Sequence, residues 1–443
     1  MTSACYILSM IESPPKNIVC NESVFSLLMD SDYKEFLDKA ERDYIYWDKA
    51  KYIAPEGIKA EDYWAAIKIS RKSKLIRFGK YTFSYKITES MQKILHQFDR
   101  FWIPVPTLIG TVSDKTKQTY LLNSVMEESI ASSQMEGAST TRRIAKDMLR
   151  MQKNPKDKSQ QMIFNNYKTI RFLSEHKNEI LSKGLILDIH KHISEKTLAS
   201  AADVGCFRRT DDIVISDSIS GDIAHFPPEY SEIEGIINEL CAFANSDDDF
   251  IHPIVKAIII HFMISFLHPF VDGNGRTARS LFYWYLLHKG YWFIEYLSIS
   301  RVIYATKAQY EKAFLYTEHD DYDLGYFLHY HLKVLDKAAA ELTRYLESKE
   351  KEINQMSELL SLTMVNERQA QIIKMARENP MRIFISKELQ LDLGVSVKTI
   401  RSDLESLVEL GLFKHRPMNK RLIGYIRSDS FDSRMEELKS SSV

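Results

Sequence analysis

The most apolar stretch of the chain runs from Ala257 to Phe270, and its only polar side chains belong to His261, Ser265 and His268. It is shorter than the ~20 residues that a membrane-spanning helix requires. A helix that is apolar around its whole circumference is buried inside a folded domain. The stretch therefore predicts a core helix of a folded protein, and we expect no membrane partner.

Composition supports a folded protein that binds no polyanion through its overall charge. The chain has 443 residues, of which 44% are hydrophobic and 27% charged, with a formal net charge of -1. This length suggests about two to four domains. Binding to nucleic acid or anionic lipid would need a local basic patch. The four cysteines form no C-x-x-C pair, so reduced thiols are expected. No secretory signal is visible at the start, and we expect a cytoplasmic protein.

The hydrophobic patterning indicates a mainly α protein with four successive parts. Residues 1–115 combine helix and strand signals around a small core. A helical domain covers residues 116–351, a separate module covers residues 360–430, and residues 431–443 form a tail. In the first part we expect helices at Ser31–Tyr46 and Glu89–Phe101, a strand at Tyr81–Tyr85, and a core containing Trp47, Trp64 and Trp102.

Most of the helical domain has helical periodicity, but Ile213–Pro228 departs from it. Its β-branched residues, its Ser220-Gly221-Asp222 turn and a second extended stretch predict a β-hairpin. A single hairpin among helices has little structural purpose, so it is a candidate functional flap. Helices are expected at Thr119–Ser132, Lys158–Glu175, Leu185–Leu198, Ser231–Ala244, His252–Leu267, Thr277–His288 and Tyr322–Lys351.

The C-terminal module predicts a winged helix-turn-helix. Helices at Asn366–Arg377, Ser386–Leu391 and Ser396–Leu410 precede two strand-like pieces, with Ser386 and Ser396 as N-caps. Such modules bind DNA, but they also bind proteins or form dimers, and both interpretations stay open. The residues available for phosphate contacts are Lys398, Arg401, Lys414, His415, Arg416, Lys420 and Arg421.

The segment from His268 to Arg279 carries the chemistry. Pro269 cannot continue a helix, so His268 should lie at a helix end, facing a loop. Gly273-Asn274-Gly275 then leads into another helix. Backbone N–H groups can converge there, beside the positive end of the helix dipole, and together they form an anion-binding nest.

The charged side chains of this segment complete a predicted polyphosphate site. Arg276 and Arg279 share one face of the first helical turn, where they oppose the helix dipole unless an anion arrives. Asp272 could hold Mg²⁺ beside the phosphates. His268 has a pKa suited to general-base work near neutrality. The Lys-Ser/Thr pair of a P-loop is missing.

These residues resemble the signature of the Fic (filamentation induced by cAMP) family, H-P-F-x-D/E-G-N-G-R-x-x-R, and match every fixed position. The resemblance covers roughly residues 116–351. It implies a helical core that holds the loop between two helices, with the hairpin as a flap that docks the target. The expected fold is thus mainly α: a Fic-type core with a β-hairpin flap, a mixed α/β N-terminal region and a C-terminal winged helix-turn-helix.

The resemblance also implies a reaction, the transfer of AMP from ATP to a Ser, Thr or Tyr hydroxyl of a protein. His268 would deprotonate the hydroxyl, and Asp272 would bind Mg²⁺. Arg276 would stabilise the β-phosphate and Arg279 the γ-phosphate. The flap sequence His225-x-Pro227-Pro228 and the preceding Gly205-Cys206-Phe207-Arg208 also look like those of the family. The nucleotide-binding segment would consist of Gly273, Asn274, Gly275, Arg276, Thr277, Ala278 and Arg279.

A second match concerns control of the site. The run from Ser132 to Gly137 resembles the inhibitory motif S/T-x-x-x-E-G/N, in which Glu136 would pair with Arg279 and occupy the γ-phosphate position. Many relatives carry two adjacent tyrosines beside the adenine. Here Gln309-Tyr310 stands at that place, so Tyr310 either borders the adenine alone or belongs to the core.

The sequence therefore predicts a protein adenylyltransferase that uses ATP and Mg²⁺, is held off by Glu136, and modifies a target protein or its own hydroxyls. Three alternatives remain: a DNA-binding regulator with a Fic sensor domain, an enzyme that uses another nucleotide, and an enzyme that removes AMP. A homodimer is also compatible with the sequence.

Overall fold

The computed structural model describes residues 11–71, 74–101, 114–216, 223–360, 362, 364–418 and 422–440. The chain forms two compact units, Met1–Thr343 and Arg344–Val443. Helix α17 (Gly325–Leu360) continues from the first unit into the second. Helices dominate both units, as the sequence predicted, and the described strands form three separate two-stranded sheets.

The N-terminal part of the first unit is a small mixed α/β assembly. Trp47 and Trp64 are both buried in it, with ring centroids 5.9 Å apart, whereas Trp102 lies outside the described residues. The elements are α2 (Glu22–Met29), the 3-10 turn η1 (Ser31–Tyr33), α3 (Lys34–Arg42), α4 (Trp47–Ala50), α5 (Ala60–Arg71), the antiparallel strands β1 (Lys74–Phe78) and β2 (Tyr81–Tyr85), and α6 (Glu89–Phe101).

Buried polar contacts join this N-terminal part to the start of α17. The ammonium group of Lys68 on α5 lies 2.8 Å from Asp320 Oδ2 and 3.3 Å from Asp323 Oδ2, and all three side chains are almost fully buried. The Tyr44 hydroxyl donates to Asp323 Oδ1 over 2.8 Å. Paired buried charges are costly to separate. The N-terminal part and the helical part therefore belong to one folded unit.

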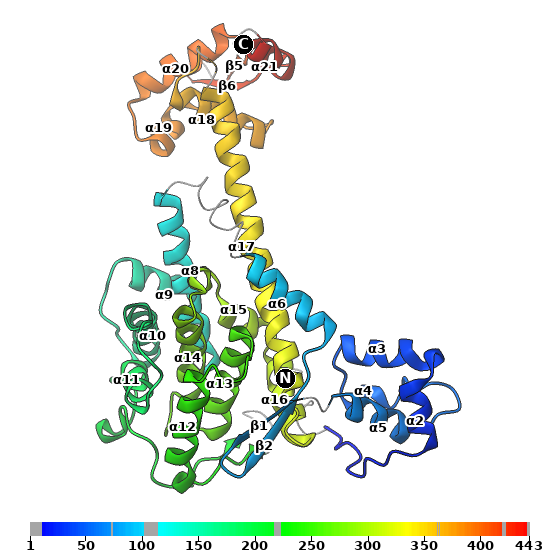
Figure 1. Ribbon diagram of the computed structural model, residues 1–443. Helices are drawn as coiled ribbons and strands as arrows, with labels where there is room; N and C mark the ends of the chain where they lie inside the picture. The colour runs from blue at the N-terminus through cyan, green and yellow to red at the C-terminus, as the bar shows by residue number, and fades with distance from the viewer. Residues whose placement is uncertain are drawn as a thin grey trace. The chain divides into compact units, whose positions relative to one another are not determined.

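The helical part is built around α13 (Pro253–Leu267) and α14 (Asn274–His288), which lie side by side (Figure 1). Residues Ala257–Ile264 are fully buried, which confirms the core helix expected there. The other elements of the helical part are α8 (Asp114–Met135), α9 (Arg142–Arg150), α10 (Lys158–Glu175), α11 (Lys183–Ser194), α12 (Tyr230–Asn245), the 3-10 turns η2 (Ala201–Asp203) and η3 (Trp292–Tyr296), α15 (Ile299–Ala305) and α16 (Lys307–His319).

The predicted flap is present as strands β3 (Ile215–Ser216) and β4 (Ile223–His225). They pair antiparallel, with Ile215 opposite His225. The expected turn at 220–222 lies outside the described residues. Among the described residues, no helix is both long and apolar enough to cross a membrane.

The second unit has the element order of the predicted winged helix-turn-helix. Phe384, Leu404, Phe413 and Tyr425 lie in its core. Residues 431–440, expected as a tail, form a helix that packs against this core through Phe431 and other buried residues. The elements are α18 (Glu367–Glu378), α19 (Ser386–Leu393), α20 (Val397–Glu409), the antiparallel strands β5 (Phe413–Pro417) and β6 (Ile423–Arg427), and α21 (Phe431–Ser440).

Only one of the two predicted serine caps forms. Ser396 accepts a hydrogen bond from the Thr399 backbone N–H and caps α20. The prediction for Ser386 was wrong, because Ile385 is the N-cap of α19 and no side chain caps it. The backbone of Phe384 pairs with Tyr425 in a β-bridge, over 2.8 and 2.9 Å. Ile385 is therefore the last extended residue, and the helix begins at Ser386, one residue earlier than a cap at Ser386 would give.

Candidate active site

His268 lies where the core helix α13 turns into the loop. As the C-cap of that helix it adopts a left-handed backbone with φ 47° and ψ 57°, and its N–H donates to Ile264 O over 3.1 Å. Non-glycine residues rarely adopt this conformation, and such strained positions concentrate at functional sites. Pro269, which follows, ends the helix for the reason the sequence indicated.

The imidazole of His268 is neutral at physiological pH. Burial lowers its pKa to about 4, which corrects the near-neutral pKa expected from the sequence. Its Nδ1 lies 3.2 Å from Ser265 O. A carbonyl can only accept, so Nδ1 carries the proton and Nε2 keeps its lone pair. The ring is thus available as a base throughout the neutral range, although it is intrinsically weaker than expected.

His190 on α11 contacts two residues of the loop, Phe270 and Asp272. Its ring stacks on Phe270 with centroids 3.7 Å apart, and its Nε2 donates to Asp272 O over 2.9 Å. The Gly205 N–H donates to Nδ1 over 3.1 Å, and this contact selects the tautomer. The sequence gives no signal for this role of His190, because a histidine on an apolar helix gives no sign of what it contacts.

Arg208 ties the loop to the base of the flap. Its Nε donates to His268 O over 3.0 Å, and its backbone N–H donates to Pro269 O over 2.8 Å. The same buried guanidinium bonds Pro228 O at the far end of the flap. The sequence marked this residue only as part of a segment preceding the flap. In the structure, it connects that flap to the backbone of the candidate base.

Three of the predicted nucleotide-binding residues direct their side chains into the protein. The Asn274 amide makes two hydrogen bonds, of 2.8 and 2.7 Å, to the backbone of Phe270 and so braces the loop. The Thr277 hydroxyl donates to Gly273 O over 2.9 Å, and Ala278 is fully buried. A phosphate contact at Asn274 therefore falls to its backbone N–H group, whereas the Thr277 N–H already donates to Gly273 O over 2.9 Å.

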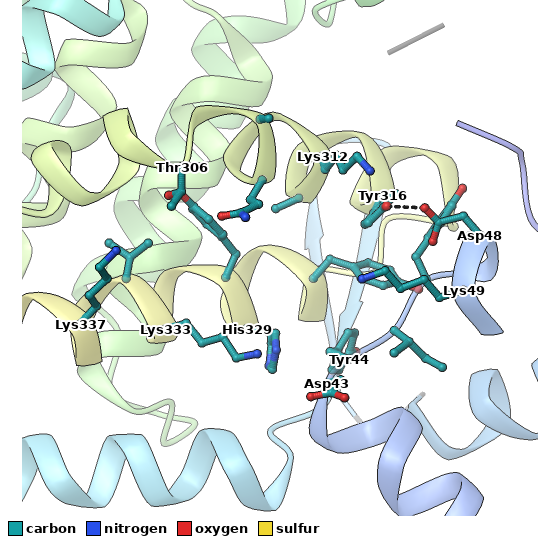
Figure 2. Close-up of a pocket in the computed structure, with 18 of the residues that line it drawn as sticks. Asp43, Tyr44, Asp48, Lys49, Thr306, Lys312, Tyr316, His329, Lys333 and Lys337 are labelled. Carbon is teal, nitrogen blue, oxygen red and sulfur yellow. Dashed lines mark hydrogen bonds between the residues drawn. The ribbon is translucent and has the colours of Figure 1, made fainter. Parts of the chain in front are cut away.

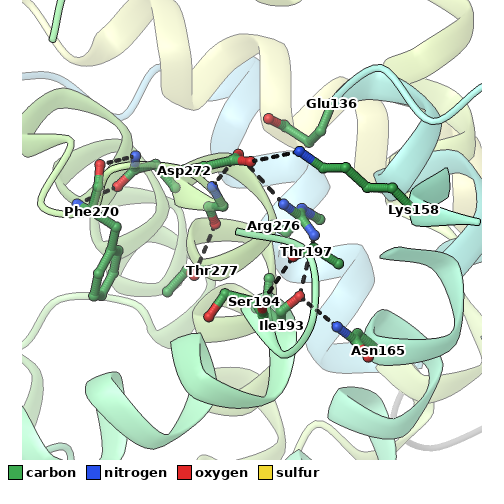
Figure 3. A network of polar contacts seen from close by, with 12 residues as sticks. Glu136, Lys158, Asn165, Ile193, Ser194, Thr197, Phe270, Asp272, Arg276 and Thr277 are labelled. Carbon is green, nitrogen blue, oxygen red and sulfur yellow. Dashed lines mark hydrogen bonds and ion pairs between the residues drawn. The ribbon is translucent and has the colours of Figure 1, made fainter. Parts of the chain in front are cut away.

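Arg276 is completely buried and only weakly paired (Figure 3). Its Nη1 donates to Ile193 O over 3.3 Å, and its Nη2 lies 3.5 Å from Asp272 Oδ1. Its Nε has no partner among the described residues. Burial lowers its pKa below the ordinary arginine value. Buried donors are normally satisfied, so this guanidinium has capacity left for an anion.

The predicted pair of Glu136 and Arg279 forms, although the two residues are far apart in sequence. Arg279 Nη2 lies 3.0 Å from Glu136 Oε1, and its Nε and Nη2 donate to Ser132 Oγ and Ser132 O over 2.8 and 2.9 Å. Glu136 follows the end of α8, where Gly137 has φ 90° and turns the chain away. A Cβ at Gly275 would be 2.2 Å from Glu136 Oε1. The Glu136 carboxylate therefore lies directly against Gly275 of the loop.

Asp272 is the residue suited to a magnesium ion. Its Oδ1 accepts from the Gly273 N–H over 2.6 Å, while Lys158 Nζ lies 4.0 Å from Oδ2 (Figure 3). The described residues hold no cluster of three or more His, Cys, Asp or Glu side chains that could bind a metal. Mg²⁺ is often bound by one or two carboxylates together with substrate phosphates. Asp272 fits that arrangement.

Comparison with known proteins identifies the domain that this loop belongs to. Residues 180–286 match the family model described as Fic/DOC family. This chain contains a Fic domain. It is similar to two proteins named protein adenylyltransferase Fic, from Nematostella vectensis (32% identical over 116 residues) and Aedes aegypti (31% over 117 residues). Each match covers 26% of this chain, and 25% and 21% of the respective relative.

A solved structure supports the fold over a longer stretch. A Fic family protein from Desulfovibrio desulfuricans G20 aligns with a TM-score of 0.52 and 18% identity. The alignment covers 79% of this chain and 99% of that one. At this identity the likeness concerns the fold. The Fic domain and its fold are therefore established, and the chain spans about a quarter of the length of the curated relatives it matches.

His225 fixes the flap of the Fic domain to two helices. Its Nε2 lies 2.7 Å from Phe266 O on α13, and its Nδ1 lies 2.8 Å from Glu318 Oε2 on α16. Each ring nitrogen thus faces an oxygen atom on a different helix. Strand β4 is thereby attached to α13 at Phe266, two residues before His268 in the sequence.

Tyr310 lies in the core of the Fic domain. Its hydroxyl is 3.1 Å from His261 Nε2, and its ring contacts Phe314 and Phe327. Burial raises its pKa to about 12. Of the two interpretations left by the sequence, these contacts favour the core residue. Contact with an adenine stays a prediction.

Proposed function

We propose that the Fic domain of this protein transfers AMP from ATP to a Ser, Thr or Tyr hydroxyl of a protein. The observation that carries the proposal is the loop 268–279. It places a neutral imidazole, a half-exposed carboxylate and two buried guanidinium groups around one helix N-terminus. The names of the similar curated proteins support the same reaction.

Each residue of the loop has a separate role in the proposed reaction. His268 Nε2 takes the proton of the target hydroxyl, whose oxygen then attacks the α-phosphorus of ATP. A new P–O bond forms, the bond to the β-phosphate bridging oxygen breaks, and pyrophosphate leaves. Arg276 stabilises the charge that develops on the leaving group, aided by the backbone N–H groups at the start of α14. Asp272 would hold Mg²⁺, which neutralises phosphate charge when it is bound.

Glu136 restrains this reaction in our proposal. It makes an ion pair with Arg279, the residue proposed to bind the γ-phosphate. The carboxylate neutralises the guanidinium and lies against Gly275, so a γ-phosphate cannot take the same place. ATP can then bind productively only after Glu136 has left Arg279.

Labelling with radioactive ATP and Mg²⁺ tests the proposal. Protein adenylylation is expected to be weak in the wild type, strong in Glu136→Gly and absent in Glu136→Gly/His268→Ala. Glu195→Gly is the matched control, because Glu195 is an exposed glutamate directly after a helix, like Glu136. It should label like the wild type. Equal labelling with and without His268 would overturn the assignment of the base.

DNA binding by the C-terminal module is a weaker second proposal. Two of its candidate phosphate contacts are already paired within the module: Lys414 with Asp429 over 2.6 Å, and His415 with Glu405 over 2.9 Å. The expected contacts Lys420 and Arg421 lie outside the described residues. A steep loss of duplex-DNA affinity with rising salt concentration would support DNA binding, and a flat response would contradict it.

A further inference from the structure

The first unit contains a pocket of about 880 Å³ away from the catalytic loop (Figure 2). Its walls come from the N-terminal part around α3 and α4 and from the faces of α16 and α17. None of its lining residues belongs to the loop 268–279. A volume of this size lies within the ~300–1,000 Å³ typical of small-molecule sites.

The charge of the pocket lining favours an anion. Five lysines line it against two carboxylates, Asp43 and Asp48, and Asp48 Oδ2 already accepts from the Tyr316 hydroxyl over 2.7 Å. None of these lysines makes an ion pair with any residue that the structure describes. A group of lysines without ion-pair partners around one cavity creates a local positive potential. The five are Lys39, Lys49, Lys312, Lys333 and Lys337.

The interior of the pocket is aromatic. Tyr46 and Tyr316 stack with ring centroids 3.9 Å apart, and the half-buried Tyr330 lies farther along α17. Aromatic and apolar walls with a few polar groups are characteristic of sites that bind flat organic molecules. An inorganic anion alone would bind the lysines but would not pack against this aromatic wall.

Two buried polar atoms of the lining have no hydrogen-bond partner among the residues that the structure describes. They are Asp48 Oδ1 and His329 Nε2. The His329 imidazole stays neutral because burial lowers its pKa to about 3. Buried polar atoms are rarely left unsatisfied. A ligand with hydrogen-bonding groups on an aromatic ring would satisfy them.

We propose that this pocket binds a nucleoside phosphate, at a site separate from the catalytic loop. The lysines would contact the phosphate, the tyrosines would pack against the base, and Asp48 and His329 would bond its polar edge. The ligand would lie against α16, the helix whose Glu318 holds the flap residue His225. The site thus borders the element that positions the flap.

Calorimetric titration of the full-length protein with AMP, GMP, ADP and GTP tests this site. At least one should bind, and Lys312→Glu/Lys333→Glu should weaken that binding at least tenfold. The matched control Lys387→Glu/Lys398→Glu carries the same charge change on exposed lysines of the second unit and should bind as the wild type does. Arg279→Ala, which alters the catalytic loop, should retain this binding.

The folding of the lysine variant is checked by its Tm and by its adenylylation activity in a Glu136→Gly background, both of which should match those of the parent protein. The proposal is overturned if none of the four nucleotides binds, if Lys312→Glu/Lys333→Glu binds them as the wild type does, or if Arg279→Ala abolishes all binding. Binding of a single-stranded oligonucleotide without any mononucleotide would also overturn it. Loss of adenylylation in His268→Ala tests only the proposed reaction. It gives no information about nucleotide binding in this pocket.

Discussion

The contact between Glu136 and Arg279 gives a quantitative prediction for nucleotide affinity. Arg279 donates two hydrogen bonds to Ser132 and one to Glu136, and a γ-phosphate would need to replace only the one to Glu136. A charge-assisted hydrogen bond contributes about 1.5–3 kcal/mol. The Glu136 side chain is 27% exposed, and solvent screening favours the lower half of that range.

Removing this contact should therefore strengthen ATP binding by roughly 10- to 40-fold, since about 1.4 kcal/mol corresponds to a factor of ten. ADP lacks the γ-phosphate, so its affinity should change much less. Calorimetric titration of Glu136→Gly with ATP and with ADP measures both values. Glu136→Gln keeps the size of the side chain and removes its charge, so it should give an intermediate gain.

Two results would refute this reasoning. If ATP and ADP gained equally in Glu136→Gly, the effect would concern access to the loop rather than the γ-phosphate. If neither affinity changed by more than twofold, the contact would not limit ATP binding at all. Glu195→Gly again serves as the control for loss of a glutamate after a helix.

Three further predictions concern pH, the loop support and the fold. Adenylylation by Glu136→Gly should stay constant from pH 8 to about pH 5, because His268 must be neutral to accept a proton, burial lowers its pKa to about 4, and the variant lacks the Glu136 charge that raises this pKa; a fall centred near pH 6.5 in a pH–rate profile would contradict the burial argument. His190→Ala in the same background should reduce the labelling rate at least tenfold while nucleotide affinity changes less, because the loop loses a ring stack and the bond to Asp272 O; an unchanged rate would show that the loop holds its own shape. Lys68→Met should lower the free energy of unfolding by about 3–5 kcal/mol, measured in urea, because it leaves two buried carboxylates without their cation; a loss below about 1 kcal/mol would indicate that water reaches the pair.

Folded stability should also depend on pH through the buried histidines. Burial lowers the pKa of His190 and His268 to about 4 and that of His331 to about 3, while an unfolded histidine titrates near 6.5. Between these values the unfolded state binds protons that the folded state does not. Stability is therefore expected to fall as pH drops from about 6.5 towards 4.

Local sequence was sufficient to place the loop and its neighbouring helices. A proline cannot continue a helix, so the helix before Pro269 ends there. Gly273 to Gly275 allow the turn into the next helix. Both effects act over a few residues, so they can be read without knowledge of the fold. The apolar run of α13 predicted its burial for the same reason, since no other environment suits a helix that is apolar on every side.

The roles of several loop residues depended on contacts that no local pattern contains. Asn274 looked like a phosphate contact, but its amide braces Phe270. His190 gave no signal, because its partners Gly205 and Asp272 come from other segments of the chain. Hydrogen-bond partners of buried side chains are chosen by packing, and packing is a property of the whole domain.

The sequence by itself thus determined which residues form the candidate catalytic loop and that two arginines lie at the start of the helix after it. The tertiary structure decided their state: it buries His268 and so lowers its pKa, and among the described residues it gives Arg276 Nε no hydrogen-bond partner. It also brings Glu136 within 3.0 Å of Arg279. Helix ends and turns follow from backbone preferences of neighbouring residues, whereas desolvation and long-range ion pairs arise only when distant segments exclude water together.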